Sequence, residues 1–105
     1  MKKSADWRLE GPLTRPNQDR TVAVFSDYNA EDRRVEVSIP TKMLGEIGSL
    51  PIKLADREMH AHHVLLAMVT QADEEGRIPP ESPSPVEIDE TRVDMHAVKG
   101  KFSAS

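Results

Sequence analysis

The sequence contains no cysteine, no long apolar run and no dense cluster of basic residues. Without cysteine, disulfide bridges, cysteine–zinc sites and thiol nucleophiles are excluded, and a reducing compartment is compatible with the chain. No stretch approaches the roughly 20 apolar residues of a membrane-spanning helix. The basic start at Met1 is not followed by the apolar segment of a secretory signal. We therefore expect a cytoplasmic protein that does not enter a membrane.

The charges of this 105-residue chain are unevenly distributed around a net charge of −4. Residues 1–72 hold ten acids and ten bases, whereas residues 73–94 hold eight acids and two bases. Nucleic-acid binding draws on clustered lysine and arginine, so a nucleic-acid partner is disfavoured. The acidic segment instead indicates a basic protein partner or a solvated surface. The residues expected to contact a protein are Glu74, Glu75, Glu87, Asp89 and Glu90.

The clearest local pattern is a β-hairpin. Residues 21–26 are β-branched and apolar, and residues 34–39 alternate strictly between polar and apolar. The six residues between them are rich in turn formers. Because Val35, Val37 and Ile39 share one face, the second strand has one buried and one solvated face.

Two helices are expected after the hairpin. Thr41 caps a short helix over residues 42–47, which Gly48 ends. The main amphipathic helix begins either at Asp56 or nearer Lys53, and it stops before Gly76. Helical spacing places its apolar side chains on one arc that faces the hairpin. These side chains are Leu54, Ala61, Leu65, Met68, Val69 and Ala72.

The composition divides the chain into three parts. Residues 1–20 form an N-terminal arm or edge strand, residues 21–76 form an α+β body, and residues 77–105 form a Pro-rich acidic linker and C-terminal tail. In this tail, residues 86–89 and 93–98 alternate in polarity, as in short added strands or a loose tail. The predicted fold is a small antiparallel sheet built on the hairpin, packed against one long helix, with extended arms.

The predicted body is too small to be comfortably stable alone. It has fewer than 60 residues, a size at which folding buries only about 60% of the unfolded surface, and a hairpin needs at least a third strand. The extra strand must come from an arm, the tail or another subunit. We therefore expect a protein partner or a homo-oligomer, with strand addition as the binding mode. Accessory proteins of phages and mobile elements, such as inhibitors and assembly subunits, often have this build.

The helix carries the one set of side chains that suggests metal binding. Asp56, His60 and His63 lie at helical spacing, and imidazole and carboxylate groups of this kind can converge on zinc. The alternative is that the two histidines are solvated. Glu58 and His62, four residues apart, are expected to form a structural pair.

A local segment, residues 33–48, resembles the central element of the AbrB/MazE swapped-hairpin DNA-binding family. It runs from a strand through Ile39-Pro40 into a short helix and a glycine. The resemblance implies a DNA-binding regulator with Arg33, Arg34 and Lys42 as the DNA contacts. The long helix after Pro51 is not part of that fold.

No catalytic set accompanies these features. The sequence has no recognisable nucleophile motif and no glycine-rich loop that could hold a phosphate. We therefore expect a non-enzymatic interaction protein without a cofactor. The DNA-binding regulator and the helix-borne metal protein remain the two alternatives.

Overall fold

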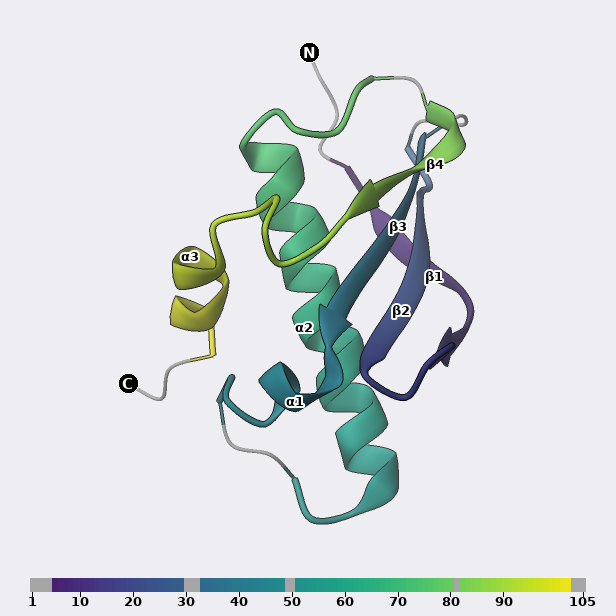
Figure 1. Ribbon diagram of the computed structural model, residues 1–105. Helices are drawn as coiled ribbons and strands as arrows, with labels where there is room; N and C mark the ends of the chain where they lie inside the picture. The colour runs from purple at the N-terminus through teal and green to yellow at the C-terminus, as the bar shows by residue number, and fades with distance from the viewer. Residues whose placement is uncertain (1–4, 30–32, 49–50, 81, 103–105) are drawn as a thin grey trace.

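The computed structural model describes residues 5–29, 33–48, 51–80 and 82–102. The chain forms a four-stranded sheet covered on one face by a long helix (Figure 1), which confirms the predicted α+β class. The strands are β1 (Trp7–Thr14), β2 (Arg20–Asp27), β3 (Arg33–Pro40) and β4 (Ser82–Ile88). The helices are α1 (Thr41–Leu44), α2 (Leu54–Glu74) and α3 (Met95–Gly100). No helix in the described part of the chain is long and apolar enough to cross a membrane.

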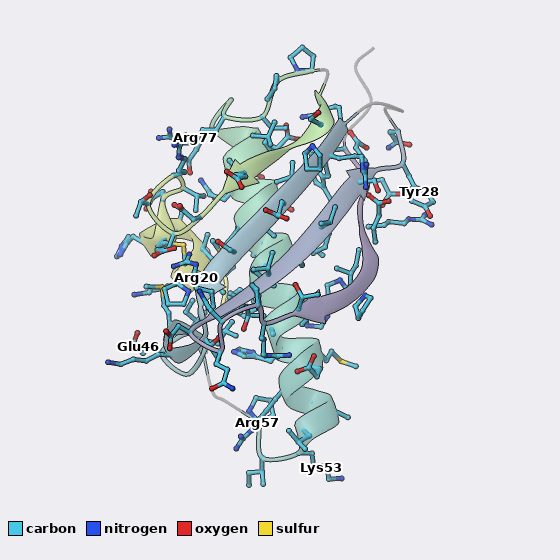
Figure 2. The ribbon with its side chains drawn as sticks, turned by 45° about the vertical axis from the view of Figure 1, so that its right-hand side comes forward. Arg20, Tyr28, Glu46, Lys53, Arg57 and Arg77 are labelled. Carbon is cyan, nitrogen blue, oxygen red and sulfur yellow. The ribbon has the colours of Figure 1, made fainter. Side chains whose placement is uncertain are left out.

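The predicted hairpin forms the centre of the sheet. Strands β2 and β3 pair antiparallel, with Phe25 opposite Val35 and Ala23 opposite Val37. These side chains face α2 and are buried. The alternate residues of both strands lie on the other face, which carries no helix (Figure 2). The alternation in the sequence therefore distinguished the covered face from the open one.

Both ends of the chain supply additional strands. Strand β1 pairs antiparallel with β2, and β4 pairs parallel with β3, giving the order β1-β2-β3-β4. Of the two predicted alternatives for residues 1–20, an edge strand is the one observed. The Pro-rich segment after Gly76 also reaches the sheet, because Val86 lies opposite Val35 and Ile88 lies opposite Val37.

Helix α2 lies across the sheet and buries one face. Its core residues are Ala61, Val64, Leu65, Met68, Val69 and Ala72, which are the predicted set with Val64 in place of Leu54. Leu54 lies on the predicted arc but is 78% exposed. The helix begins there, with Lys53 as its N-cap, and this end extends past the sheet (Figures 1 and 2). Periodicity finds the correct side of a helix but not how far the opposite layer extends.

The two short helices close the core at one end. Helix α1 follows Pro40 and is shorter than predicted, and the Thr41 hydroxyl lies 2.9 Å from that of Thr21. Residues 93–98 do not form a strand: α3 begins at Met95, where Asp94 accepts hydrogen bonds from the amides of His96 and Ala97. An N-cap aspartate stabilises a helix start, and it outweighed the alternating pattern here.

Candidate functional site

The sheet has two edges, and they offer different main-chain groups. On β1, the Asp6 carbonyl accepts a hydrogen bond from the Tyr28 amide at 2.9 Å. Because hydrogen-bonded pairs alternate along an antiparallel ladder, the main-chain groups of Arg8 and Glu10 also face β2. Those of Trp7 and Leu9 therefore face away from the sheet, and no described strand pairs with them.

The same alternation runs across the sheet to β4. The main-chain groups of the odd-numbered residues of β3 bond to β2, so those of Glu36 bond to β4. In a parallel ladder the partners of Glu36 are then Val86 and Ile88. The outward-facing position in the regular part of β4 is then Glu87, and Pro85 lies in the irregular part between Ser82 and Val86. Proline has no N–H, and prolines are typical of edge strands that resist further pairing. The β4 edge is therefore blocked where the β1 edge is open.

The open part of the β1 edge is short. The pairing of β1 with β2 is interrupted between Glu10 and Thr14. Gly11 has a φ of +70°, a conformation that glycine adopts readily. Pro12 follows and contributes no N–H. The regular edge thus spans Trp7 to Glu10, which offers two donors and two acceptors.

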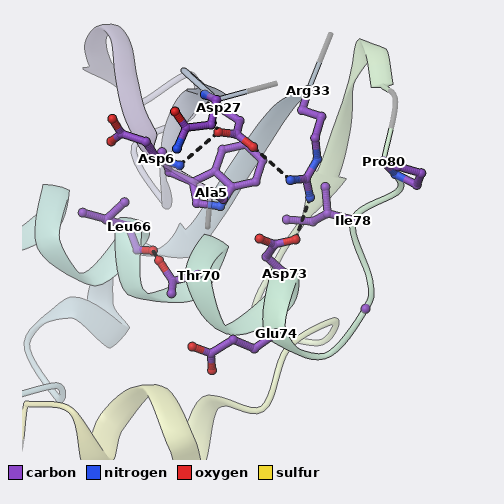
Figure 3. Close-up of a pocket in the computed structure, with 13 residues that line it drawn as sticks. Ala5, Asp6, Asp27, Arg33, Leu66, Thr70, Asp73, Glu74, Ile78 and Pro80 are labelled. Carbon is purple, nitrogen blue, oxygen red and sulfur yellow. Dashed lines mark hydrogen bonds and ion pairs between the residues drawn. The ribbon is translucent and has the colours of Figure 1, made fainter. Parts of the chain in front are cut away.

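A pocket of about 1010 Å³ adjoins the start of this edge. Its wall comes from the chain at Ala5–Trp7, from the β2–β3 end of the sheet and from the second half of α2 (Figure 3). Leu66, Thr70 and Asp73 lie at helical spacing on one side of α2 and all line it. The pocket therefore lies between an open strand edge and a helix.

A buried ion network forms the floor of this region. Arg33 donates to Asp27 at 2.9 Å, to Asp73 at 2.6 Å and to the Pro79 carbonyl at 3.3 Å. The exposed fractions of the side chains are 13% for Arg33, 2% for Asp27 and 27% for Asp73. The guanidinium carbon also lies 5.0 Å from the centre of the Trp7 ring. A charge buried this deeply requires its partners, so the network joins the sheet to α2.

Asp27 also fixes the start of β1. Its Oδ1 atom accepts hydrogen bonds from the amides of Asp6 at 3.0 Å and Asn29 at 2.9 Å. The carboxylate is thereby satisfied on both oxygens, since Oδ2 binds Arg33. The first residues of β1 are thus held beside the pocket by a carboxylate of β2.

The five acidic residues predicted to contact a protein divide into two groups. Glu75 accepts hydrogen bonds from Arg77, Gln71 and the Asp94 amide, and the Arg77 contact in particular lowers the pKa of Glu75. Asp89 accepts from Thr91, whose hydroxyl lowers the pKa of Asp89, and Glu90 binds Arg20. These three side chains act within the fold.

The other two acids point outward. Glu74 and Glu87 are exposed, and neither forms a hydrogen bond or ion pair with another described residue. Glu74 lies at the rim of the pocket, and Glu87 lies on the open face of the sheet. Of the five, Glu74 alone lines this pocket.

The candidate DNA contacts are not gathered on one surface. Arg33 is enclosed in its ion network, whereas Arg34, the next residue along β3, lies on the opposite face and pairs with Glu10 at 2.9 Å. Lys42 is exposed on α1. The strand, Ile-Pro and short helix of the resemblance are present, but the DNA-binding alternative stays a prediction.

The candidate metal ligands are likewise apart. No group of three histidine, aspartate or glutamate side chains among the described residues could hold a metal ion. Asp56 is exposed near the start of α2, and His60 lies 3.2 Å from the Leu44 carbonyl through its Nε2 atom. His63 is exposed beside His62. The predicted pairing of Glu58 with His62 is not observed, because Glu58 binds Arg15 and His62 packs near Phe25.

Little in the sequence indicates this site. Asp6, Asp27 and Asp73 are separate in the chain and meet only once β1 and α2 take their places on the sheet. One local pattern does bear on the edges: Pro85 adjoins an alternating segment, and proline in such a segment is typical of an edge strand. Comparisons with protein-family models, with curated protein sequences and with solved structures found no match for this chain.

Proposed function

We propose that this protein is a non-enzymatic interaction module of the cytoplasm that binds an extended segment of a partner protein as an added strand on β1. The observation that supports this most directly is the asymmetry of the two edges. The main-chain groups of Trp7 and Leu9 face outward with no described strand beside them, whereas Pro85 removes a donor from β4. Extended segments add to edges of the first kind.

The energetics require more than main-chain pairing. A hydrogen bond of this type contributes about 1 kcal/mol net, and the edge offers only four groups. A micromolar complex needs roughly 8 kcal/mol. Side-chain contacts must supply the rest, and the pocket between Ala5–Trp7 and α2 adjoins the edge where such contacts would form.

The proposal is tested with peptides selected against the immobilised protein from a random-sequence display library. The best peptide is titrated into ¹⁵N-labelled protein. We expect the largest amide shifts at Trp7 and Leu9. N-methylation of the peptide amides that face β1 should weaken binding at least about tenfold, because each methyl group removes a donor and blocks close approach.

N-methylation of the intervening peptide amides is the matched control and should have little effect. Shifts centred on Glu87 or on the open face at Val24 would contradict the proposal. Sedimentation of the protein alone tests whether a second copy of this chain occupies the edge instead. A dimer with the same Trp7 and Leu9 shifts would assign the edge to a second copy of this chain.

A further inference from the structure

The pocket beside β1 has an excess of negative charge. Its lining includes the carboxylates of Asp6, Asp27, Asp73 and Glu74, and Arg33 is the only cation among the described residues that line it. Arg8, outside the pocket, pairs with Asp6 at 3.0 Å. When both arginines are counted, the described residues leave two negative charges uncompensated.

Arg33, the one cation among the described lining residues, is already engaged by the protein. All three nitrogen atoms of the Arg33 guanidinium already donate to Asp27, Asp73 and Pro79. By contrast, the Oδ2 atom of Asp73 accepts no hydrogen bond from a described residue, and the carboxylate of Glu74 has no described partner. The arrangement therefore favours a ligand that donates hydrogen bonds and carries positive charge.

A second observation indicates that the ligand also carries a hydrogen-bond acceptor. Trp7 lines the pocket and is only 7% exposed, yet its Nε1–H is buried without a hydrogen-bond partner among the described residues. A buried donor without a partner carries a free-energy cost. A hydrogen-bond acceptor that enters the pocket beside Trp7, such as a peptide carbonyl, is the group that this donor lacks.

We propose that the pocket receives a cationic side chain, lysine or arginine, of the segment that adds to β1. The ammonium or guanidinium group lies against Asp73 and Glu74, while the main chain of the same segment continues along Trp7 and Leu9. This inference rests on the proposed function, because the pocket supplies the side-chain contact that a short edge needs. The sequence predicted a basic partner, and this inference places a positive charge of that partner in the pocket.

The experiment uses two blocked pentapeptides of identical length, acetyl-Thr-Val-Lys-Val-Thr-amide and its norleucine analogue. Both are titrated into the full chain, and binding is followed through the indole N–H resonance of Trp7. The chain has one tryptophan, so this signal is unambiguous. We expect the lysine peptide to bind about fivefold more tightly at low salt, and the difference should shrink at high salt.

Two variants locate the charge. Asp73→Asn and Glu74→Gln should each reduce the preference for lysine over norleucine. Glu87→Gln, an exposed carboxylate away from the pocket, is the matched control and should leave it unchanged. Because Asp73 also binds Arg33, its variant is compared only if its unfolding midpoint stays close to that of the parent. If the midpoint falls, Glu74→Gln decides alone.

A second pair of ligands separates the two proposals. Acetyl-lysine methylamide and acetyl-norleucine methylamide carry the side chain without a strand. Equal binding of the two pentapeptides along Trp7 and Leu9 overturns the cationic pocket but leaves strand addition standing. A Trp7 indole shift with the lysine amide alone, without amide shifts along β1, supports the pocket and overturns strand addition. No indole shift with any lysine ligand overturns the pocket.

Discussion

The two edges of this sheet differ in the main-chain groups that they present. The β4 edge presents Pro85, which cannot donate, and the charged Glu87, two features that discourage further pairing. The β1 edge presents the full main-chain groups of Trp7 and Leu9 and adjoins a pocket. The difference shows that protection against pairing is local, and that the unprotected edge is the one to examine for a partner.

The edges also differ in how the fold holds them. Strand β4 is fixed by the buried Ile88 and by the ion pair of Glu90, just beyond it, with Arg20 of β2. Strand β1 is fixed at its start through the Asp6 amide, which binds the buried carboxylate of Asp27. Both edges combine apolar burial with polar contacts, and the polar contact of β1 belongs to the charged network at the pocket.

The largest expected effect comes from breaking that network. Arg33→Ala leaves the carboxylate of Asp27 buried without its counter-ion and should lower the free energy of unfolding by about 3–5 kcal/mol. Arg34→Ala, one residue away on the open face, removes a more exposed ion pair with Glu10 and should cost less than about 1 kcal/mol. Urea unfolding of both variants measures the difference, and equal losses would contradict the assignment.

A smaller effect distinguishes the apolar contacts of the two edges. Ile88→Ala removes a buried side chain from β4 and should cost about 3 kcal/mol. Leu9→Ala removes a half-buried side chain from β1 and should cost about 1 kcal/mol. Thermal or urea unfolding provides the comparison. A larger loss for Leu9 would mean that β1 is held mainly by apolar burial.

Acid should weaken the helical support beneath β2 and β1. His62 of α2 lies 5.8 Å from Phe25, whose neighbour on β1 is Leu9. Burial, with a smaller contribution from His63, lowers the pKa of His62 below its ordinary 6.5. The unfolded chain then takes up this proton at a higher pH than the folded chain, so stability falls as pH drops through about 6.5.

The measurement for His62 is the urea midpoint between pH 7.5 and 5.5. His62→Gln should reduce the fall of the urea midpoint between these two pH values. His63→Gln is the control: it leaves the burial of His62 in place and should preserve most of the fall. An unchanged pH dependence in His62→Gln would assign the effect to another group.

The smallest effect on stability should come from Pro85→Thr. Residue 85 is exposed, and threonine suits a strand, so the free energy of unfolding should change by less than about 0.5 kcal/mol. The substitution restores an N–H to β4 and should add a second, weaker site for extended peptides or promote self-association. Peptide stoichiometry and sedimentation report this. No change in either would mean that Pro85 is not what blocks the edge.

Much of the fold follows from local patterns. The alternation of residues 34–39 predicts the buried face of β3, and the helical spacing after Lys53 predicts five of the six core residues of α2. The prediction that Leu54 is buried was wrong, because burial depends on the extent of the sheet beneath the helix. Residues 93–98 were misleading because a cap at Asp94 determines their conformation.

The site depends on pairings that no local pattern contains. Asp27 and Asp73 are 46 residues apart and meet through Arg33, which the resemblance had placed at a DNA surface. The acidic segment was a useful signal only in part, since Glu75, Asp89 and Glu90 serve the fold. Charge counts locate excess charge along the chain but cannot tell which carboxylates are already paired.

The most direct test of the open edge is the contact between a bound peptide and the protein main chain. Intermolecular NOEs are measured between the peptide Hα protons and the amides of the ¹⁵N-labelled protein. The account predicts contacts to the amides of Trp7 and Leu9, in the alternating pattern of an added strand. Contacts confined to β4 near Glu87, or to the open face near Val24, would contradict it.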